Sequence, residues 1–399
     1  MQDVRVQLRE GRVDLVRMGS VKETGDAFPP WVVVDGDGLA LEPVVAYLRS
    51  LALGSSSPSS CRSYGYDLLR WFRVLWQLDM SWDRATSAEV EVLVGWMRSA
   101  KNPQRIRRKK DAAPAGSVNL RTGKQALGPG YAPRTINHAL SVIYSFYDFH
   151  AGQGTGPVIN PVPLSADRRA SLAHRSPMEH QPVVRRSRLR QRVPKRAPRS
   201  LPDAMWDELF AAMTNERNRA LLAAYVSSGA RAEELLGIGI EDVDWAGQRI
   251  YVISKGTKLR EPVPASPDAF RFLASYLDRA GVPARGERLW RTLRGEDRPL
   301  TYSAMRRALQ RANEKLGTNW TLHDLRHTAA TRMANDPKLT LPEVQAVMRH
   351  AKLETTSIYL TVGLEEMVDK LQDFYTMPRP QPKFAPGYDP ADIKAVFGG

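Results

Sequence analysis

The sequence predicts a mainly α-helical protein with a small β-sheet in its second half, an α+β fold divided between two domains. Apolar residues recur at helical spacing from residue 41 to about residue 150. Two short strand-like segments joined by a turn, at 250–264, interrupt a later helical region. A Gly/Pro-rich and then strongly basic stretch without periodicity separates the two regions and is typical of a linker. A chain of 399 residues is long enough for two or three separate cores.

Residues 1–37 are predicted to form a short β-rich extension. Val4, Val6 and Leu8 alternate with other residues, as in a half-buried strand. The apolar run 31–34 leads into a turn rich in Asp and Gly. The segment is short for an independent domain, so we expect a lid or flap on its neighbour.

Residues 38–163 are predicted to form a small helical domain. Its four helices are expected at residues 41–53, 59–78, 86–100 and 133–150. Thr86 is a suitable N-cap, and Glu89, three residues later, completes a capping box. Pro133 occupies a favoured first-turn position. We assign the aromatic residues of these helices to the core rather than to base stacking.

The charge balance is strongly basic, with 58 Lys and Arg against 43 Asp and Glu and a net charge of +15. Such a surplus favours a polyanionic partner, and nucleic acid is the expected one. Cys61 is the single cysteine, which excludes an intrachain disulfide and a cysteine zinc cluster. The sequence shows neither a signal peptide nor an apolar run long enough to cross a membrane. We therefore expect a soluble, cytoplasmic protein that acts on nucleic acid.

Two basic segments concentrate this charge, an insert at 101–131 and the linker at 164–199. Residues 168–199 alone contain 11 Lys or Arg and one acidic residue, Glu179. A free linker of this composition would extend by self-repulsion, whereas contact with DNA would release counterions and add salt-sensitive affinity. We favour contact with DNA. The candidate DNA-binding residues in these segments are Arg107, Arg108, Lys109, Arg186, Arg188, Arg190 and Arg192, and Lys258 outside them is a further candidate.

Residues 200–378 are predicted to form the second domain. A helix over 219–228 is nearly all apolar after its first residue and is therefore expected to be buried. Gly229 ends it and the next helix begins at once, which places Arg231 at the junction.

A predicted hairpin follows in the same domain. Its strands are expected at 250–254 and 259–264, and its turn carries Lys255 and Lys258. A lysine in such a turn can reach a ligand from an exposed position, and either lysine could do so here.

The stretch 321–331 gathers unusual polar groups on a largely apolar helix. His323, Arg326 and His327 share one face because residues three and four apart are neighbours. The spacing of the two histidines is also that of two zinc ligands. However, Asp324 stands where a metalloprotease of that type has Glu, and Arg326 would place a cation on the metal-binding face. A phosphate is therefore the better partner for this face.

Four segments resemble the signature motifs of the tyrosine recombinase (phage integrase) family. They are SGARAEEL at 228–235, ISKGTKLREPVP at 253–264, HDLRHTAAT at 323–331 and HAKLETTSIY at 350–359. The resemblance covers about residues 41–375. Arg349 departs from it, since the family usually has Gly before the histidine, and Ala230 replaces a larger apolar residue. No clear domain for a second class of DNA site precedes residue 41.

The resemblance implies a two-domain DNA clamp. Residues 38–163 would be the helical core-binding (SAM-like) domain, 200–378 the catalytic domain and 379–399 a C-terminal tail. The implied function is site-specific DNA recombination through a covalent 3′-phosphotyrosyl intermediate, in the integration, transposition or resolution of mobile DNA. The reaction needs no metal, ATP or other cofactor.

The resemblance also assigns roles to residues. Tyr359 would be the nucleophile that attacks the scissile phosphorus. Arg231 and Arg326 would hold the two non-bridging oxygens, for which the planar guanidinium is well suited.

Three further groups complete the implied catalytic set. Lys255 would protonate the leaving 5′-oxygen, with Lys258 as its rival. His323 would act as general acid and base, and His350 would hydrogen-bond a phosphate oxygen. His327 has no assigned chemistry and is interpreted as a supporting residue.

The implied assembly is a homotetramer on two double-stranded DNA sites, one dimer on each, that passes through a Holliday junction. An accessory directionality protein is a possible further partner, and a bacterial or phage-encoded, nucleoid-associated protein is implied. The C-terminal helix 365–374, or an apolar turn at 391–397, could dock on a neighbouring subunit; a tail without fixed structure is the alternative. Two other functions remain open: a type IB topoisomerase, and a non-catalytic DNA-binding or bridging protein of the same fold.

Overall fold

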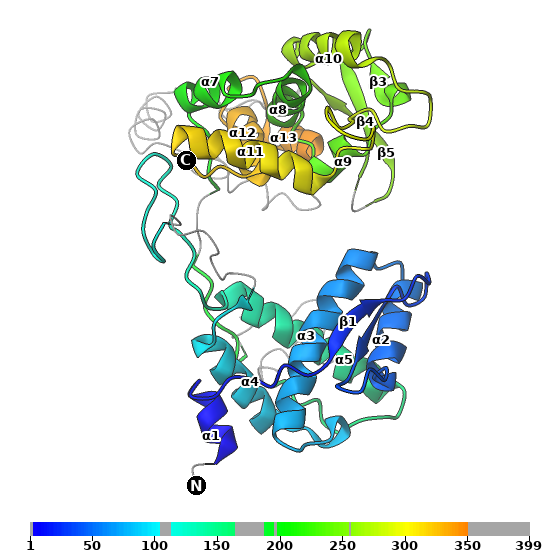
Figure 1. Cartoon of the computed structure of the whole chain (residues 1–399), viewed down its shortest axis with the longest axis vertical. Helices are drawn as coiled ribbons and strands as arrows, with labels where there is room; N and C mark the ends of the chain where they lie inside the picture. The colour runs from blue at the N-terminus through cyan, green and yellow to red at the C-terminus, as the bar shows by residue number, and fades with distance from the viewer. Residues whose placement is uncertain (1–2, 104–112, 164–186, 195–197, 255–256, 350–399) are drawn as a thin grey trace, which may run out of the picture. The chain divides into compact units, whose positions relative to one another are not determined.

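The computed structural model describes residues 3–103, 113–163, 187–194, 198–254 and 257–349 (Figure 1). The chain divides into two compact units, Met1–Lys195 and Arg196–Gly399. Each unit has its own hydrophobic core. The helices predicted at 365–374 and 391–397 lie outside the described residues.

Helices make up most of the first unit. They are α1 (Val4–Arg9), α2 (Glu42–Leu53), α3 (Pro58–Gln77), α4 (Ser87–Ser99) and α5 (Pro133–Gly152), with a short 3-10 helix η1 (Trp82–Arg84). Strands β1 (Ser20–Glu23) and β2 (Trp31–Val34) form an antiparallel hairpin that packs beside α3 (Figure 1). The four helices predicted from periodicity and capping signals are confirmed as α2 to α5.

The strand predicted at Val4, Val6 and Leu8 is wrong, because this segment forms α1. Asp3 caps the helix by accepting a hydrogen bond from the Arg5 backbone N–H at 3.0 Å. Leu8 is fully buried in the core, whereas Val4 is exposed. A short helix is enough to bury a single apolar side chain, so the alternation of Val4, Val6 and Leu8 did not indicate one face of a sheet.

The predicted capping box at the start of α4 is confirmed. The Thr86 backbone N–H donates to Glu89 Oε2 at 2.8 Å, and Thr86 Oγ1 accepts from the Ala88 N–H at 3.2 Å. Arg5 of α1 pairs with the same Glu89 carboxylate. This acidic residue therefore links the beginning of α4 to α1.

Most aromatic residues in the helices of the first unit lie in its core, as predicted, whereas Tyr66 is exposed. Trp71, Phe146 and Tyr147 are among its largest fully buried side chains. Trp71 Nε1 donates to Tyr147 Oη at 3.0 Å, and Tyr147 Oη donates to the Trp82 carbonyl at 2.9 Å. The polar atoms of these rings are thus satisfied inside the core, and the rings are not available as base-stacking platforms.

The second unit is also mainly helical. Its helices are α7 (Asp203–Ala211), α8 (Glu216–Ser228), α9 (Ala232–Leu236), α10 (Pro267–Ala280), α11 (Tyr302–Leu316), α12 (Leu322–Ala334) and α13 (Leu341–Met348), with a 3-10 helix η3 (Ile240–Asp242). Strands β3 (Val243–Asp244), β4 (Arg249–Ile253) and β5 (Arg260–Pro264) form one antiparallel sheet in that order. The hairpin predicted from the sequence is β4–β5, and β3 extends it.

Helix α8 lies at the centre of the second unit. Most of its residues are buried, as its apolar composition predicted, and it packs against α10 and α12 (Figure 1). The fold is therefore mainly α with small antiparallel sheets, in agreement with the predicted class. Across the described ranges, no helix combines the length and the apolar character that a membrane span requires.

Candidate functional site

Arg231 lies at the junction of two helices. Helix α8 ends at Ser228, and Gly229 takes a left-handed conformation with φ of 61°. A side chain at Gly229 would collide with Met348, since a Cβ there would lie 2.5 Å from Met348 Sδ. Arg231 is then the N-cap of α9, and its backbone N–H donates to Glu234 Oε2 at 2.9 Å. The sequence therefore fixes the Arg231 backbone by a glycine on one side and a carboxylate cap on the other.

The Arg231 guanidinium is partly exposed. Its Nη1 donates to Glu234 Oε1 at 2.7 Å, and about 36% of the side chain faces solvent. A cation that is anchored on one side and open on the other can bind an anion from solvent.

Arg326 of α12 is buried and holds two helix ends together. Its Nη1 donates to the Gly229 carbonyl and its Nη2 donates to the Met348 carbonyl at 2.6 Å. These carbonyls belong to the C-terminal ends of α8 and α13, the negative ends of both helix dipoles. Arg326 as a whole residue is 5% exposed. Arg326 thus fixes the backbone two residues before Arg231 and the end of α13.

His323 lies in the first turn of α12 and is exposed to solvent. Its ring meets the His327 ring edge-on, with centroids 4.1 Å apart. The packing around His323 reduces its hydration and, with the positive charges of Arg326 and Arg231, lowers its pKa below the usual histidine value, against a smaller opposing effect of Asp324. The lowered pKa favours the neutral form of the imidazole, which can accept a proton.

Asp324, next to His323, has a structural role. Its carboxylate accepts from the Thr321 backbone N–H at 2.8 Å and pairs with Arg199, whose guanidinium also covers the Trp320 ring at 4.7 Å. This acidic group is thus engaged in capping α12 and holding the segment that enters α7. Over the described part of the chain, no group of three or more His, Cys, Asp or Glu is arranged to hold a metal ion.

The structure brings together three of the six predicted catalytic residues. Arg231, His323 and Arg326 converge where the ends of α8 and α13 meet α12, and the charge of Arg231 acts on His323. Lys255, His350 and Tyr359 lie outside the described residues. Lys258 is exposed in the β4–β5 turn with a positive φ of 61°.

The predicted DNA-binding residues divide in a similar way. Arg107, Arg108, Lys109 and Arg186 lie outside the described residues. Of the described residues of the predicted linker, 187–194 belong to the first unit and 198–199 to the second. Arg188 pairs with Glu91, and Arg190 Nη2 donates to Ser141 Oγ at 2.6 Å. Arg192 is exposed. Arg188 and Arg190 are therefore held on the surface of the helical unit by contacts to α4 and α5.

Glu234 and Arg349 are site residues that the sequence reasoning did not assign. Arg349 Nη2 lies 2.6 Å from Glu234 Oε2, and both side chains are more than nine-tenths buried. The sequence did mark Arg349 as unusual, because Gly usually stands at this position in the family that the sequence resembles. The carboxylate that joins Arg231 to Arg349 could not be found from spacing, because it depends on a contact between residues 115 positions apart.

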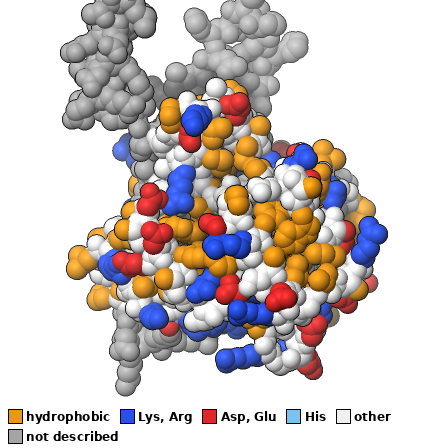
Figure 2. Space-filling view, turned by 90° about the horizontal axis from the view of Figure 1, so that it is seen from above, with side chains coloured by type: hydrophobic (Ala, Val, Ile, Leu, Met, Phe, Trp, Pro, Cys, Tyr) orange, Lys and Arg blue, Asp and Glu red, His pale blue; other side chains and the backbone are white. Residues whose placement is uncertain are grey.

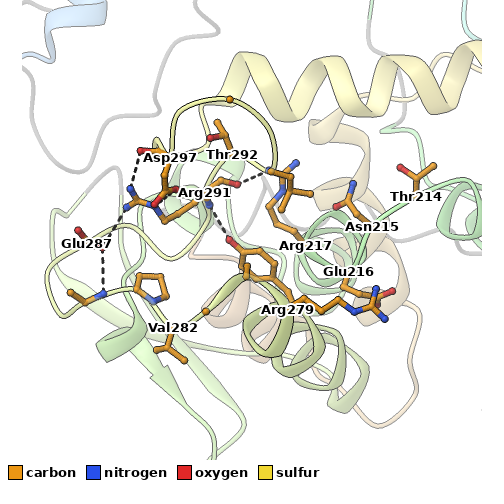
Figure 3. Close-up of a pocket in the computed structure, with 17 residues that line it drawn as sticks. Thr214, Asn215, Glu216, Arg217, Arg279, Val282, Glu287, Arg291, Thr292 and Asp297 are labelled. Atoms are coloured by element: carbon orange, nitrogen blue, oxygen red, sulfur yellow. Dashed lines mark hydrogen bonds and ion pairs between the residues drawn. The ribbon is translucent and has the colours of Figure 1, made fainter.

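The second unit also contains a cavity of about 570 Å³ away from these residues. Arg217, Arg279, Arg291 and Asp297 are among the residues around it (Figure 3). Neither Arg231, His323 nor Arg326 lines this cavity. On the face of the molecule in Figure 2, Lys and Arg are interspersed with acidic and hydrophobic side chains rather than forming one basic surface. Neither feature changes the location of the candidate site.

Comparison with known sequences finds a family model that is similar to the second unit. Residues 200–365 match the sequence model described as the phage integrase family. The tyrosine recombinase XerC of Corynebacterium glutamicum is 33% identical over 165 residues, 40% of this chain and 52% of the relative. That of Pelobacter propionicus is 35% identical over 169 residues, 41% of this chain and 55% of the relative. The chain thus spans about half the length of these two relatives.

A weaker similarity extends over almost the whole chain. Transposase A from transposon Tn554 of Staphylococcus aureus is 21% identical over 364 residues, 87% of this chain and 94% of the relative.

Solved structures share the fold. The integrase of transposon Tn1549 in complex with transposon right end DNA matches with a TM-score of 0.55 and 14% identity, over 84% of this chain and 99% of that one. A lambda integrase dimer bound to a COC′ core site matches with a TM-score of 0.55 and 15% identity, over 81% and 98%. At these identities the likeness concerns the fold alone.

Proposed function

This chain belongs, through residues 200–365, to the phage integrase family of tyrosine recombinases, and from this premise we propose that it is a site-specific DNA recombinase. The convergence of Arg231 and Arg326 with His323, whose pKa is lowered, supports the proposal most directly. Two guanidinium groups and a proton acceptor are what cleavage of a phosphodiester by a hydroxyl group requires.

The proposed reaction begins with attack by the Tyr359 oxygen on the scissile phosphorus. His323 accepts the phenolic proton, the bond from phosphorus to the 5′-oxygen breaks, and Lys255 or Lys258 gives that oxygen a proton. A 3′-phosphotyrosyl bond and a free 5′-hydroxyl result. Because one phosphoester replaces another, a 5′-hydroxyl can reverse the step without ATP.

The arginines stabilise the charge that develops on the non-bridging oxygens. Arg231 approaches the phosphate from the open side of its guanidinium, and Arg326 acts from a position fixed by two helix ends. His350 would bind a further oxygen. The residues themselves supply the positive charge, so no metal enters the proposed reaction.

The proposed substrate is double-stranded DNA at a recombination site. Arg188, Arg190, Arg192 and Lys258 are the described candidates for backbone contacts, and phosphate contacts of this kind add affinity without reading sequence. We propose a dimer on each site and a tetramer on two sites. The near full-length similarity to a transposase favours the movement of mobile DNA over chromosome resolution.

A covalent-capture experiment tests the proposal. The protein is incubated with a pool of nicked duplexes of randomised sequence, in which loss of the short 5′-hydroxyl fragment prevents rejoining, and adducts are separated on a denaturing gel. We expect a covalent protein–DNA band from the wild type and none from Tyr359→Phe. Tight DNA binding by the wild type with no adduct would support the non-catalytic alternative instead. Relaxation of supercoiled plasmid regardless of sequence would support a topoisomerase.

A further inference from the structure

Arg349 ends helix α13 in an unusual conformation. Its backbone is left-handed, with φ of 52° and ψ of 49°, a region that long side chains rarely adopt. Glycine would adopt it without strain. The side chain at this position is buried rather than free in solvent, with 8% exposed. A strained backbone conformation at a residue with a buried charged side chain indicates that this side chain has a functional role.

The Arg349 side chain is directed to Glu234. Its Nη2 lies 2.6 Å from Glu234 Oε2, and its Nη1 donates to the Val347 carbonyl at 3.1 Å. Its Nε is buried without a hydrogen-bond partner within the described ranges. The contact with the carboxylate is therefore made although another donor of the same guanidinium stays unsatisfied.

Glu234 connects this arginine to Arg231. One carboxylate oxygen accepts from the Arg231 backbone and from Arg349, and the other accepts from the Arg231 guanidinium. Without Arg349, the buried Glu234 would neutralise Arg231 one to one. With it, the three side chains carry a net charge of +1, and the exposed member, Arg231, presents that charge to solvent.

We propose that Arg349 is a positioning residue for the phosphate-binding arginine Arg231. Arg349 balances the charge of Glu234 and fixes the orientation of its carboxylate. Arg231 is thereby oriented toward the scissile phosphate and keeps a net positive charge that binds an anion. The inference rests on the proposed function. Arg349 also follows Met348, whose carbonyl is bound by Arg326, so both arginines of the site are coupled to the end of α13.

The test compares three variants in single-turnover cleavage of a nicked duplex recovered from the capture experiment. Arg349→Met removes the charge, Arg349→Gly removes it while relieving the backbone, and Arg298→Met removes an exposed arginine charge of the same unit. We expect both Arg349 variants to lower the rate constant of adduct formation about 10- to 100-fold, because a misplacement of about 1 Å can cost a hundredfold. DNA affinity should change no more than in Arg298→Met.

Two readouts separate positioning from a merely structural role. Arg349→Gly should melt above Arg349→Met and still cleave slowly, because both variants lose the pair with Glu234 but only glycine suits the left-handed backbone. In an Arg231→Lys background, Arg349→Met should cost far less than it does in the wild type, because the residue acts through Arg231.

The outcomes are distinct for the two proposals. A wild type that forms no adduct overturns the proposed function and this inference with it. A wild type that cleaves, with Arg349→Gly cleaving equally fast, overturns this inference alone. The same holds if the losses from Arg349→Met and Arg231→Lys simply add.

Discussion

Replacing Arg326 by Met should destabilise the second unit, because one buried guanidinium bonds the ends of α8 and α13. A hydrogen bond to a charged group contributes about 1.5–3 kcal/mol, and two such bonds are lost. Relief from burying a cation offsets part of this loss. The expected net cost is about 2–4 kcal/mol, which for a unit of this size lowers Tm by about 5–15 °C.

The assay is calorimetry on the full chain, with hydrogen exchange of the buried α8 amides assigning the transition to the second unit. Arg332→Met is the matched control, because Arg332 lies on the same helix and makes an exposed pair with Asp203 at 2.6 Å. An exposed pair contributes about 0–1 kcal/mol. If the Tm of Arg326→Met equals that of Arg332→Met, the two carbonyl contacts do not stabilise the unit and the reasoning is refuted.

Two further predictions concern the first unit and His323. Gly95→Ala should destabilise the first unit by about 1–3 kcal/mol, because a Cβ there would lie 2.6 Å from the Arg9 carbonyl oxygen. Gly152→Ala is the control and should not destabilise the unit, because the space around its Cβ is open. Equal urea midpoints for the two variants would contradict the close approach of α1 to α4. Reduced hydration and the neighbouring arginines lower the pKa of His323, so the rate of adduct formation should fall only below the usual titration range of histidine. Stability should fall as pH drops through that usual range, because the unfolded chain then binds more protons than the folded one. An NMR titration that places this pKa at or above the ordinary value would contradict the neutral imidazole.

The helices were predictable where local signals and periodicity agreed. The capping box of Thr86 and Glu89, the first-turn Pro133 and the apolar spacing of α5 depend on neighbours within a few residues. The alternation of Val4, Val6 and Leu8 led to a wrong prediction of a strand, because only Leu8 is buried in the core.

The candidate site was predictable in part. Arg231 and His323 stand near helix ends that the sequence marks with Gly229 and a Thr cap, and Arg326 lies three residues after His323 on α12. The Glu234–Arg349 pair was not predictable, since it depends on how α9 and α13 pack. The catalytic roles of all six residues stay predictions, and Lys255, His350 and Tyr359 also lie outside the described residues.

The measurement that tests the central claim most directly is the identity of the residue joined to DNA. The adduct is digested with nuclease and protease, and the peptide that carries the nucleotide is sequenced by mass spectrometry. We predict a phosphodiester between the 3′ end of the DNA and the Tyr359 oxygen. A linkage to any other residue, or to the 5′ end of the DNA, would contradict the account.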